Sequence, residues 1–203
     1  MLTLLALMTS LQGTDMSGSY VLQGVREVGS ELQLKKDGTF EYMLAYGAAD
    51  YWAKGSWRVD KEAVVLNSDG PEPPATFVLT KSSTTQSAAL HIRLIGANGR
   101  PVPNIDVRLL GASEPLKART DSDGIAMFPK SGGINAVQFE VRVYQYVSEP
   151  IPLDQAQNDF SYTINGDSIM QLRFKNERMP IEKGSLLLKY WGGPQGMRYS
   201  KGH

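Results

Sequence analysis

Residues 31–57, ELQLKKDGTFEYMLAYGAADYWAKGSW, combine regular alternation with clear turn signals, and they decide the fold class. Leu32 and Leu34 alternate with polar residues, and apolar residues again take every second position from Phe40 to Tyr46. Alternation with a period of two is typical of half-buried strands. The Asp-Gly pair between the two runs tolerates the positive φ values of a tight hairpin. The stretch therefore predicts two hairpin-linked strands, followed by a third strand that opens at residues 55–57.

Aromatic residues crowd into the second half of this stretch. Gly47 to Asp50 interrupts the strand pattern, so we expect Tyr51 and Trp52 to lie in a loop. Loops on a rigid β scaffold commonly carry binding residues, and aromatic rings offer large contact areas to sugars, apolar ligands and proteins. We therefore predict a binding surface that comprises Asp50, Tyr51, Trp52 and Trp191. An alternative is that the loop folds over the end of a small barrel and plugs it.

The rest of the chain repeats short alternating runs, with turn signals about every ten residues, which predicts an all-β protein built as a sandwich or a barrel. We expect a first β domain at 16–80, a polar linker at 81–88 (KSSTTQSA) and a second β domain at 89–166. Residues 167–203, which alternate as a strand does at 170–174, either finish the second domain or return to complete the first. A barrel with a filled interior needs about eight strands, and the first region supplies about five, so the count favours the return.

The second region carries a recognisable order of strands and turns. It runs LHIRLIGANGRPVPNIDVRLLG, with a Gly-Pro turn and a Val-rich strand, and then ARTDSDGIAMF, with a T-D-x-x-G turn before an aromatic-bearing strand. In this order residues 89–165 resemble the carboxypeptidase regulatory-like, or transthyretin-like, β-sandwich family. The sequence departs from the family at Asn104 and Ile105, where Gly-Ala is more usual. The resemblance implies an Ig-like sandwich that serves exported proteins as a non-catalytic structural or interaction domain.

The first region shows a second resemblance, carried by Gly18-Ser19-Tyr20, Asp37-Gly38-Thr39-Phe40 and Gly55-Ser56-Trp57. Residues 18–80 are similar to the lipocalin-like small β-meanders or barrels of exported bacterial proteins of unknown function. True lipocalins usually carry Trp where Tyr20 stands, and their barrels are longer. The resemblance therefore implies a fold but transfers no ligand pocket.

Charge and cysteine content exclude several classes of function. The chain has 21 basic and 21 acidic residues, so no net field attracts nucleic acid or an anionic membrane, and we expect neither nucleic-acid binding nor stable membrane insertion. There are no cysteines, which excludes disulfides, thiolate metal sites and a cysteine nucleophile in this chain.

The first residues bear on location. Leu2 to Met8 is an apolar run, LTLLALM, which resembles the hydrophobic core of a secretory signal and is much shorter than the roughly 20 residues of a membrane span. We interpret residues 1–15 as the remnant of a signal peptide or as an N-terminal extension that packs on the body. The first interpretation predicts a periplasmic or extracellular protein, while the second leaves a cytoplasmic location open.

Few residues are candidates for chemistry. His91 alternates with apolar neighbours and is expected to face solvent, and His203 is the last residue. Asp121 and Asp123 resemble the start of a calcium loop, but the twelfth position is Gly132 where an EF-hand needs Glu. A hairpin turn capped by the carboxylate of Asp121 explains the motif better, although these two residues stay the metal candidates of the sequence. No catalytic residue is assigned and no cofactor is predicted.

Three functions are compatible with these observations. The first is an exported, non-enzymatic binding or structural accessory whose partner is a protein or a small apolar or carbohydrate ligand. The second is a carrier of a small apolar ligand in the N-terminal β domain, in a cavity lined by Phe40, Tyr42, Tyr46 and Trp57. The third is a hydrolase that uses an unrecognised pair among the carboxylates, which are Glu31, Glu41, Asp50 and Glu62.

Overall fold

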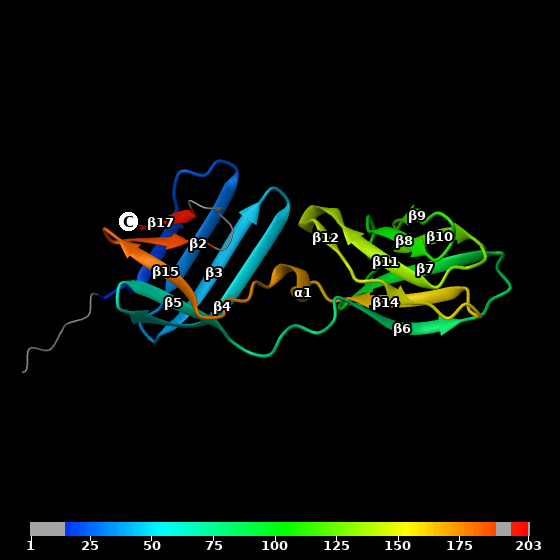
Figure 1. Ribbon diagram of the computed structural model, residues 1–203, viewed down its shortest axis with the longest axis horizontal. Coiled ribbons are helices and arrows are strands. Elements are labelled where there is room, and N and C mark those ends of the chain that lie inside the picture. The colour runs from blue at the N-terminus through cyan, green and yellow to red at the C-terminus, as the bar shows by residue number, and fades with distance from the viewer. Residues whose placement is uncertain (1–14, 190–195, 203) are drawn as a thin grey trace, which may run out of the picture. The chain divides into compact units, whose positions relative to one another are not determined.

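The computed structural model describes residues 15–189 and 196–202, and these residues form an all-β protein (Figure 1). Their helical segments are short, namely the 3-10 turn Arg142–Tyr144 and the single-turn helix α1 (Asp167–Met170). None of the described helices has the length and apolar character needed to cross a membrane. The predicted all-β class is confirmed. Nearly all of the expected signal-like segment, residues 1–14, lies outside the described residues.

The first compact unit is a closed barrel of eight strands in the order β1-β17-β16-β15-β5-β4-β3-β2. Its strands are β1 (Gly18–Leu22), β2 (Val28–Leu34), β3 (Thr39–Tyr46), β4 (Ala49–Asp60), β5 (Ala63–Ser68), β15 (Glu177–Glu182), β16 (Ser185–Leu188) and β17 (Met197–Lys201). The last strand pairs with the first, Tyr20 opposite Lys201, so the blue and red ends of the chain lie side by side in Figure 1. The strands after residue 172 therefore complete the barrel, and the second unit is inserted between β5 and β15.

The predicted hairpin joins β2 to β3 and sets their register. The backbone N–H of Thr39 donates to Oδ1 of Asp37 at 2.9 Å, and Gly38 takes a left-handed φ of 84°. These two features close the turn, because glycine has no Cβ to oppose a positive φ. Leu34 then lies opposite Phe40, so the apolar residues of both strands face the barrel core.

The barrel core includes a residue from the far side of the insertion. Phe174 follows α1 in the chain, is 1% exposed, and packs edge-on against Tyr42 with ring centroids 5.4 Å apart. The strand-like alternation at 170–174 is not a strand, because the N–H groups of Met170 and Gln171 close a helical turn on the carbonyls of Gly166 and Asp167. The largest buried side chains of the barrel are Tyr20, Leu32, Leu34, Phe40, Tyr42, Leu66, Phe174 and Tyr199.

A chain of buried hydroxyl groups crosses the barrel interior. The hydroxyl of Tyr199 lies 2.8 Å from Ser30 Oγ and 3.0 Å from the hydroxyl of Tyr42, and Ser30 Oγ donates to the carbonyl of Met43. Burial raises the pKa of both tyrosines above the ordinary value, since a phenolate in an apolar interior loses its hydration. Tyr199 thus satisfies two other buried polar groups as well as its own.

The second compact unit consists of two sheets that share one core. One sheet has the order β10-β7-β14-β6, and the other has the order β12-β11-β8-β9 with β13 beside β11. The strands are β6 (Phe77–Ser83), β7 (Ala89–Gly96), β8 (Asp106–Leu110), β9 (Leu116–Arg119), β10 (Ile125–Pro129), β11 (Ala136–Val141), β12 (Tyr146–Val147), β13 (Ile151–Pro152) and β14 (Asp159–Ile164). Phe139 links the sheets: its ring stacks on Phe77 at 4.2 Å and meets Tyr162 edge-on at 5.1 Å.

The expected linker at 81–88 is part of this two-sheet unit. Lys81 to Ser83 belong to β6, which pairs with β14, and the polar residues that follow are held by Asn158. The Asn158 side chain is 4% exposed, accepts from the N–H of Thr85 and donates to the carbonyls of Ser87 and Ala89. A small, polar composition was typical of a linker, but here it supplies the backbone groups that satisfy a buried amide.

The turns of the two-sheet unit follow their sequence signals. Asp121 Oδ1 accepts from the N–H groups of Asp123 and Ile125, each at 2.9 Å, and Gly124 has a φ of 71°. The predicted turn capped by Asp121 is confirmed. Asn104 takes a left-handed φ of 64°, a region that asparagine tolerates better than most residues.

Two buried tyrosines, Tyr162 and Tyr199, are expected to differ in how much their hydroxyl groups contribute to stability. Tyr162 is fully buried in the two-sheet core, its hydroxyl has no hydrogen-bond partner among the described residues, and burial raises its pKa to about 12. Tyr162→Phe removes an unsatisfied group and is expected to leave stability unchanged or raise it by about 1 kcal/mol. Tyr199→Phe removes a hydrogen-bond partner from the buried hydroxyl groups of Tyr42 and Ser30 and should cost about 1–3 kcal/mol. Urea denaturation of the two variants checks this, and equal losses would contradict it.

Candidate functional site

The binding surface expected from the sequence lies on a strand. We predicted a loop at Tyr51 and Trp52, but the turn is confined to residues 47 and 48, where Gly47 has a φ of 59°, and β4 resumes at Ala49. Asp50 and Trp52 share the outward face of β4, with Asp50 exposed and Trp52 half-buried. Tyr51 lies on the alternate face and is also half-buried. Trp191 lies outside the described residues.

Trp52 has a basic neighbour on its own strand. The ammonium group of Lys54, two residues on, lies 5.9 Å from the centre of the Trp52 ring, a geometry that is typical of a cation–π contact. The structure therefore does not bring the three described residues of the expected surface together on one face.

The other sequence candidates are engaged locally. His91 is half-buried, and its Nε2 lies 3.5 Å from Ser87 Oγ. Glu31 accepts from Ser19 Oγ, and Glu41 pairs with Lys35. Within residues 15–189 and 196–202, no group of three His, Cys, Asp or Glu side chains is placed to hold a metal ion, and Asp121 Oδ1 is occupied by backbone N–H groups.

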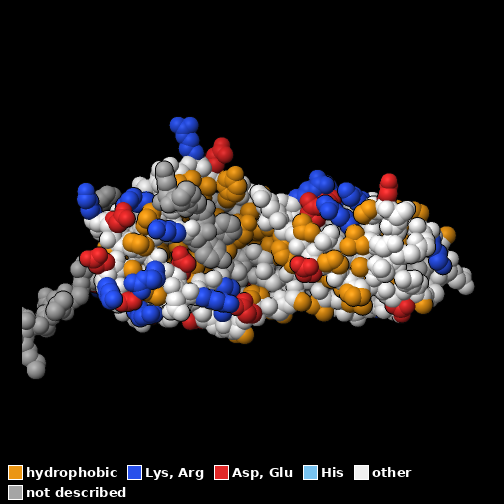
Figure 2. All heavy atoms as spheres, viewed as in Figure 1, with side chains coloured by type: hydrophobic (Ala, Val, Ile, Leu, Met, Phe, Trp, Pro, Cys, Tyr) orange, Lys and Arg blue, Asp and Glu red, His pale blue; other side chains and the backbone are white. Residues whose placement is uncertain are grey.

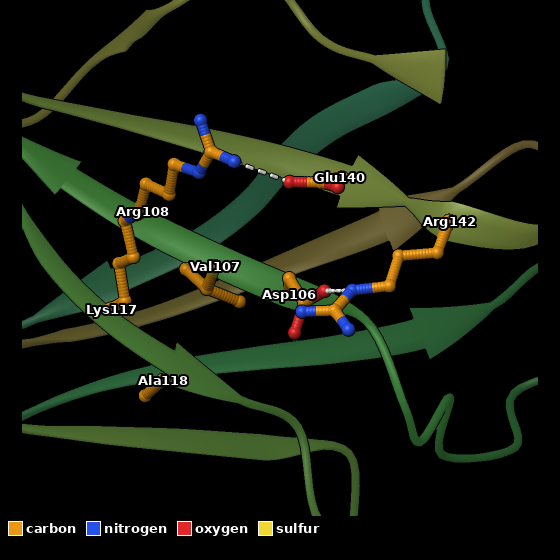
Figure 3. Close-up of a pocket in the computed structure, with 7 residues that line it drawn as sticks. All are labelled: Asp106, Val107, Arg108, Lys117, Ala118, Glu140 and Arg142. Atoms are coloured by element: carbon orange, nitrogen blue, oxygen red, sulfur yellow. Dashed lines mark hydrogen bonds and ion pairs between the residues drawn. The ribbon is translucent and has the colours of Figure 1, made fainter. Parts of the chain in front are cut away.

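A concave charged surface lies elsewhere, on the outer face of the sheet that contains β8, β9 and β11. Alternation produces it: Val107, Leu109 and Phe139 point inward and are fully buried, so the residues between them point to solvent. The depression has a volume of about 280 Å³ (Figure 3). Its lining residues are Asp106, Val107, Arg108, Lys117, Ala118, Glu140 and Arg142.

Strand register places these charges in contact. Asp106 of β8 lies opposite Arg119 of β9 on one side and opposite Glu140 of β11 on the other. The Arg119 Nε donates to Asp106 Oδ1 at 2.8 Å, and Arg142 donates to the other oxygen of the same carboxylate. Arg108 donates to Glu140 at 2.5 Å, and Figure 3 shows the Arg108 side chain pointing toward Glu140. We call the six charged residues the charged groove; they are Asp106, Arg108, Lys117, Arg119, Glu140 and Arg142.

The carboxylate of Asp106 organises this network. Its partial burial, with 14% of the side chain exposed, raises the pKa, but hydrogen bonds from Arg119 and Arg142 outweigh that effect and hold the pKa below its usual range. Asp106 is therefore ionised at neutral pH and fixes two guanidinium groups at the groove. Each guanidinium has five N–H donors, so both retain donors beyond those that Asp106 uses.

The charged residues that line the depression are three basic and two acidic, an excess of one positive charge, and Arg119 adds a further basic group through its pair with Asp106. The excess is local, since residues 70–172 contain eight basic and ten acidic residues in all. In Figure 2, basic side chains gather around acidic ones on one part of the two-sheet unit. Lys117 is exposed and makes no ion pair or side-chain hydrogen bond within the described part of the chain. The groove can therefore receive an anionic group.

The charged groove cannot be predicted from the sequence, because it depends on how the strands are ordered in the sheet. Alternation marks Arg108, Lys117, Glu140 and their neighbours as outward-facing, but it does not show that β8, β9 and β11 are adjacent. What the sequence does show is that charged residues take alternate positions in both strands, Asp106 and Arg108 in one and Lys117 and Arg119 in the other. Comparison of the chain with protein-family models, with curated proteins and with solved structures finds no match.

Proposed function

We propose that this protein is a non-enzymatic binding accessory that recognises an acidic polypeptide through the charged groove. The observation that carries the proposal is a concave surface lined by three basic and two acidic side chains, in which Lys117 makes no ion pair with any described residue. In this proposal the barrel is lipocalin-like, the two-sheet unit is a transthyretin-like sandwich, and the apolar run at Leu2 to Met8 directs export to the periplasm or beyond.

The guanidinium groups of the charged groove are already held in place in the free protein. Asp106 holds Arg119 and Arg142, and Glu140 holds Arg108, so little side-chain entropy is lost when these guanidinium groups bind. Guanidinium groups match carboxylates in a planar, two-bonded geometry. A polypeptide with a few separated carboxylates fits better than a continuous polyanion, because a nucleic-acid backbone would also meet Asp106 and Glu140.

The packed side chains inside the barrel favour the function of a binding accessory over that of a carrier of an apolar ligand. Phe40 and Tyr42, two of the four residues expected to line a cavity, are 1% exposed and pack against Phe174. Tyr46 is 54% exposed. Trp57 is half-buried and donates its indole N–H to the carbonyl of Lys35 at 2.9 Å, where it supports the β2–β3 turn.

Lys117→Glu tests the proposed function. Titration of the protein with a fluorescent ten-residue peptide, in which a few glutamates are separated by neutral residues, at about 50 mM NaCl should show binding that weakens as salt is added. The Lys117→Glu variant is expected to bind about tenfold more weakly, because a charge reversal near a bound carboxylate costs roughly 1 kcal/mol or more at a solvated surface.

The matched control is Lys81→Glu. Lys81 is exposed on β6, in the other sheet of the same unit, and the substitution changes the net charge equally. It should leave peptide affinity within about twofold, since the effect of the groove depends on position as well as charge. Absence of peptide binding by the unmodified protein, or equal weakening by both variants, rules out the groove as the recognition site.

A further inference from the structure

A second pocket lies between the two sheets of the two-sheet unit, at the end where β7 and β14 begin. Two connections contribute most of its walls, residues 130–134 between β10 and β11 and residues 153–158 between β13 and β14. The N–H of Leu153 donates to the carbonyl of Asn135 at 2.8 Å, which holds the two connections together. The pocket has a volume of about 210 Å³, and its described lining residues are distinct from those of the charged groove.

The floor of this pocket is apolar. It includes Leu90, Ile134 and Leu153, which belong to the core of the unit and keep 6–8% of their surface exposed. A cavity of roughly 150 Å³ holds a benzene molecule, so the larger pocket has room for one ring and a short chain. The floor therefore favours an apolar group of about the size of a phenylalanine or leucine side chain.

One wall of the pocket presents hydrogen-bond donors. Lys130 is exposed on it and forms no ion pair with another described residue. The neighbouring backbone N–H groups, those of Ser131, Gly132 and Gly133, make no hydrogen bond within residues 15–189 and 196–202. An ammonium group beside free backbone N–H groups is a suitable partner for a carboxylate.

The other wall presents acceptors. The carboxylate of Asp154 accepts from the N–H of Ala156 at 2.9 Å and from Nε2 of Gln157 at 3.2 Å. These two bonds leave further lone pairs on Asp154, since a carboxylate has about four acceptor sites. The amide oxygen of Gln157 is buried and has no hydrogen-bond partner among the described residues. A carboxylate beside an unpaired carbonyl dipole attracts a cation, so this wall favours an ammonium group.

We propose that this pocket binds a free apolar α-amino acid. Lys130 and the N–H groups of residues 131–133 hold its carboxylate, Asp154 holds its ammonium group, and the side chain lies on the apolar floor. Lys130 and Asp154 line the same pocket but form no ion pair with each other, so a ligand that carries both charges can bridge them. One basic and one acidic side chain line the pocket, which disfavours a ligand with a single charge.

Titration of the whole isotope-labelled protein with L-phenylalanine tests this site. Amide NMR spectra should show shifts at residues 130–134 and 153–158, with a dissociation constant on the order of 1 mM. Phenethylamine lacks the carboxylate and hydrocinnamate lacks the ammonium group, so each is expected to bind about tenfold more weakly through loss of charge-assisted hydrogen bonds. Absence of these shifts at millimolar ligand overturns the proposal, and so does equal affinity for the three ligands.

Two variants assign the contacts of the two charges. Lys130→Gln should weaken binding of L-phenylalanine about tenfold and leave phenethylamine within about twofold, because phenethylamine has no carboxylate to lose a partner. Asp154→Asn should likewise weaken L-phenylalanine and spare hydrocinnamate. Lys81→Gln, on β6 of the same unit, is the control and should leave all three affinities unchanged. Equal weakening of all three ligands by Lys130→Gln or Asp154→Asn shows a general effect on the loops and overturns the assigned contacts.

Discussion

Gly55→Ala is expected to destabilise the barrel by at least about 3 kcal/mol, toward the upper end of overpacking effects. Gly55 lies on β4 opposite Ser68 of β5. A Cβ at this position would lie 1.9 Å from the carbonyl oxygen of Asn67 and 2.7 Å from the Cα of Ser68. Both are backbone atoms, so no side-chain rotation relieves the clash and the two strands must separate.

Gly29→Ala is the matched control in the same barrel. Gly29 lies on β2, and a Cβ there would meet no heavy atom within 4 Å. Its substitution is expected to be neutral or slightly stabilising, because alanine lowers the entropy of the unfolded chain. Trp52 and Trp57 both lie on β4, so tryptophan fluorescence during urea denaturation follows the affected strand. A midpoint for Gly55→Ala that equals that of Gly29→Ala contradicts the backbone clash.

Phe174→Ala should cost about 3–5 kcal/mol, as is usual for removal of a buried phenylalanine. Phe174 is 1% exposed and contacts the rings of Phe40 and Tyr42. It also joins the two ends of the insertion, since its carbonyl accepts from the N–H of Ser68 at 2.8 Å. The substitution therefore opens a cavity where the chain re-enters the barrel.

Met43→Ala serves as the control for Phe174→Ala. Met43 lies on β3 with 66% of its surface exposed, so its truncation removes little packing and should change stability by less than about 0.5 kcal/mol. The free energy of unfolding from urea titrations of both variants checks the difference. A Phe174→Ala variant as stable as Met43→Ala would falsify the placement of this residue in the barrel core.

Local features of the fold were predictable from the sequence because they depend on neighbouring residues. The hairpin at Asp37 and Gly38 and the turn at Asp121 form as their residue types predict, since each is closed by bonds between residues two to four apart. The all-β class follows from the same local alternation.

Long-range features were not predictable, because alternation does not identify strand partners. A count of strands favoured the return of the C-terminal segment to the barrel, but it did not identify Phe174 as the side chain that fills the core. The predicted linker boundary at residue 81 differs from the structure because Lys81 to Ser83 pair with β14, and because Asn158, far along the chain, bonds the backbone of Thr85, Ser87 and Ala89. The charged groove could not be predicted either, because Asp106, Arg119 and Arg142 come into contact only when β8 pairs with β9 and β11.

The insertion of the two-sheet unit between β5 and β15 has a consequence for the order in which the chain acquires structure. The ribosome makes β1 to β5 first, but β1 cannot pair with β17 until Met197–Lys201 have been made. All partners within the two-sheet unit are complete earlier, so this unit can fold while the barrel is still open. During synthesis the edges of β1 and β5 therefore stay unpaired, and unpaired strand edges can pair with other chains. We expect the incomplete barrel, rather than the two-sheet unit, to be the part that aggregates.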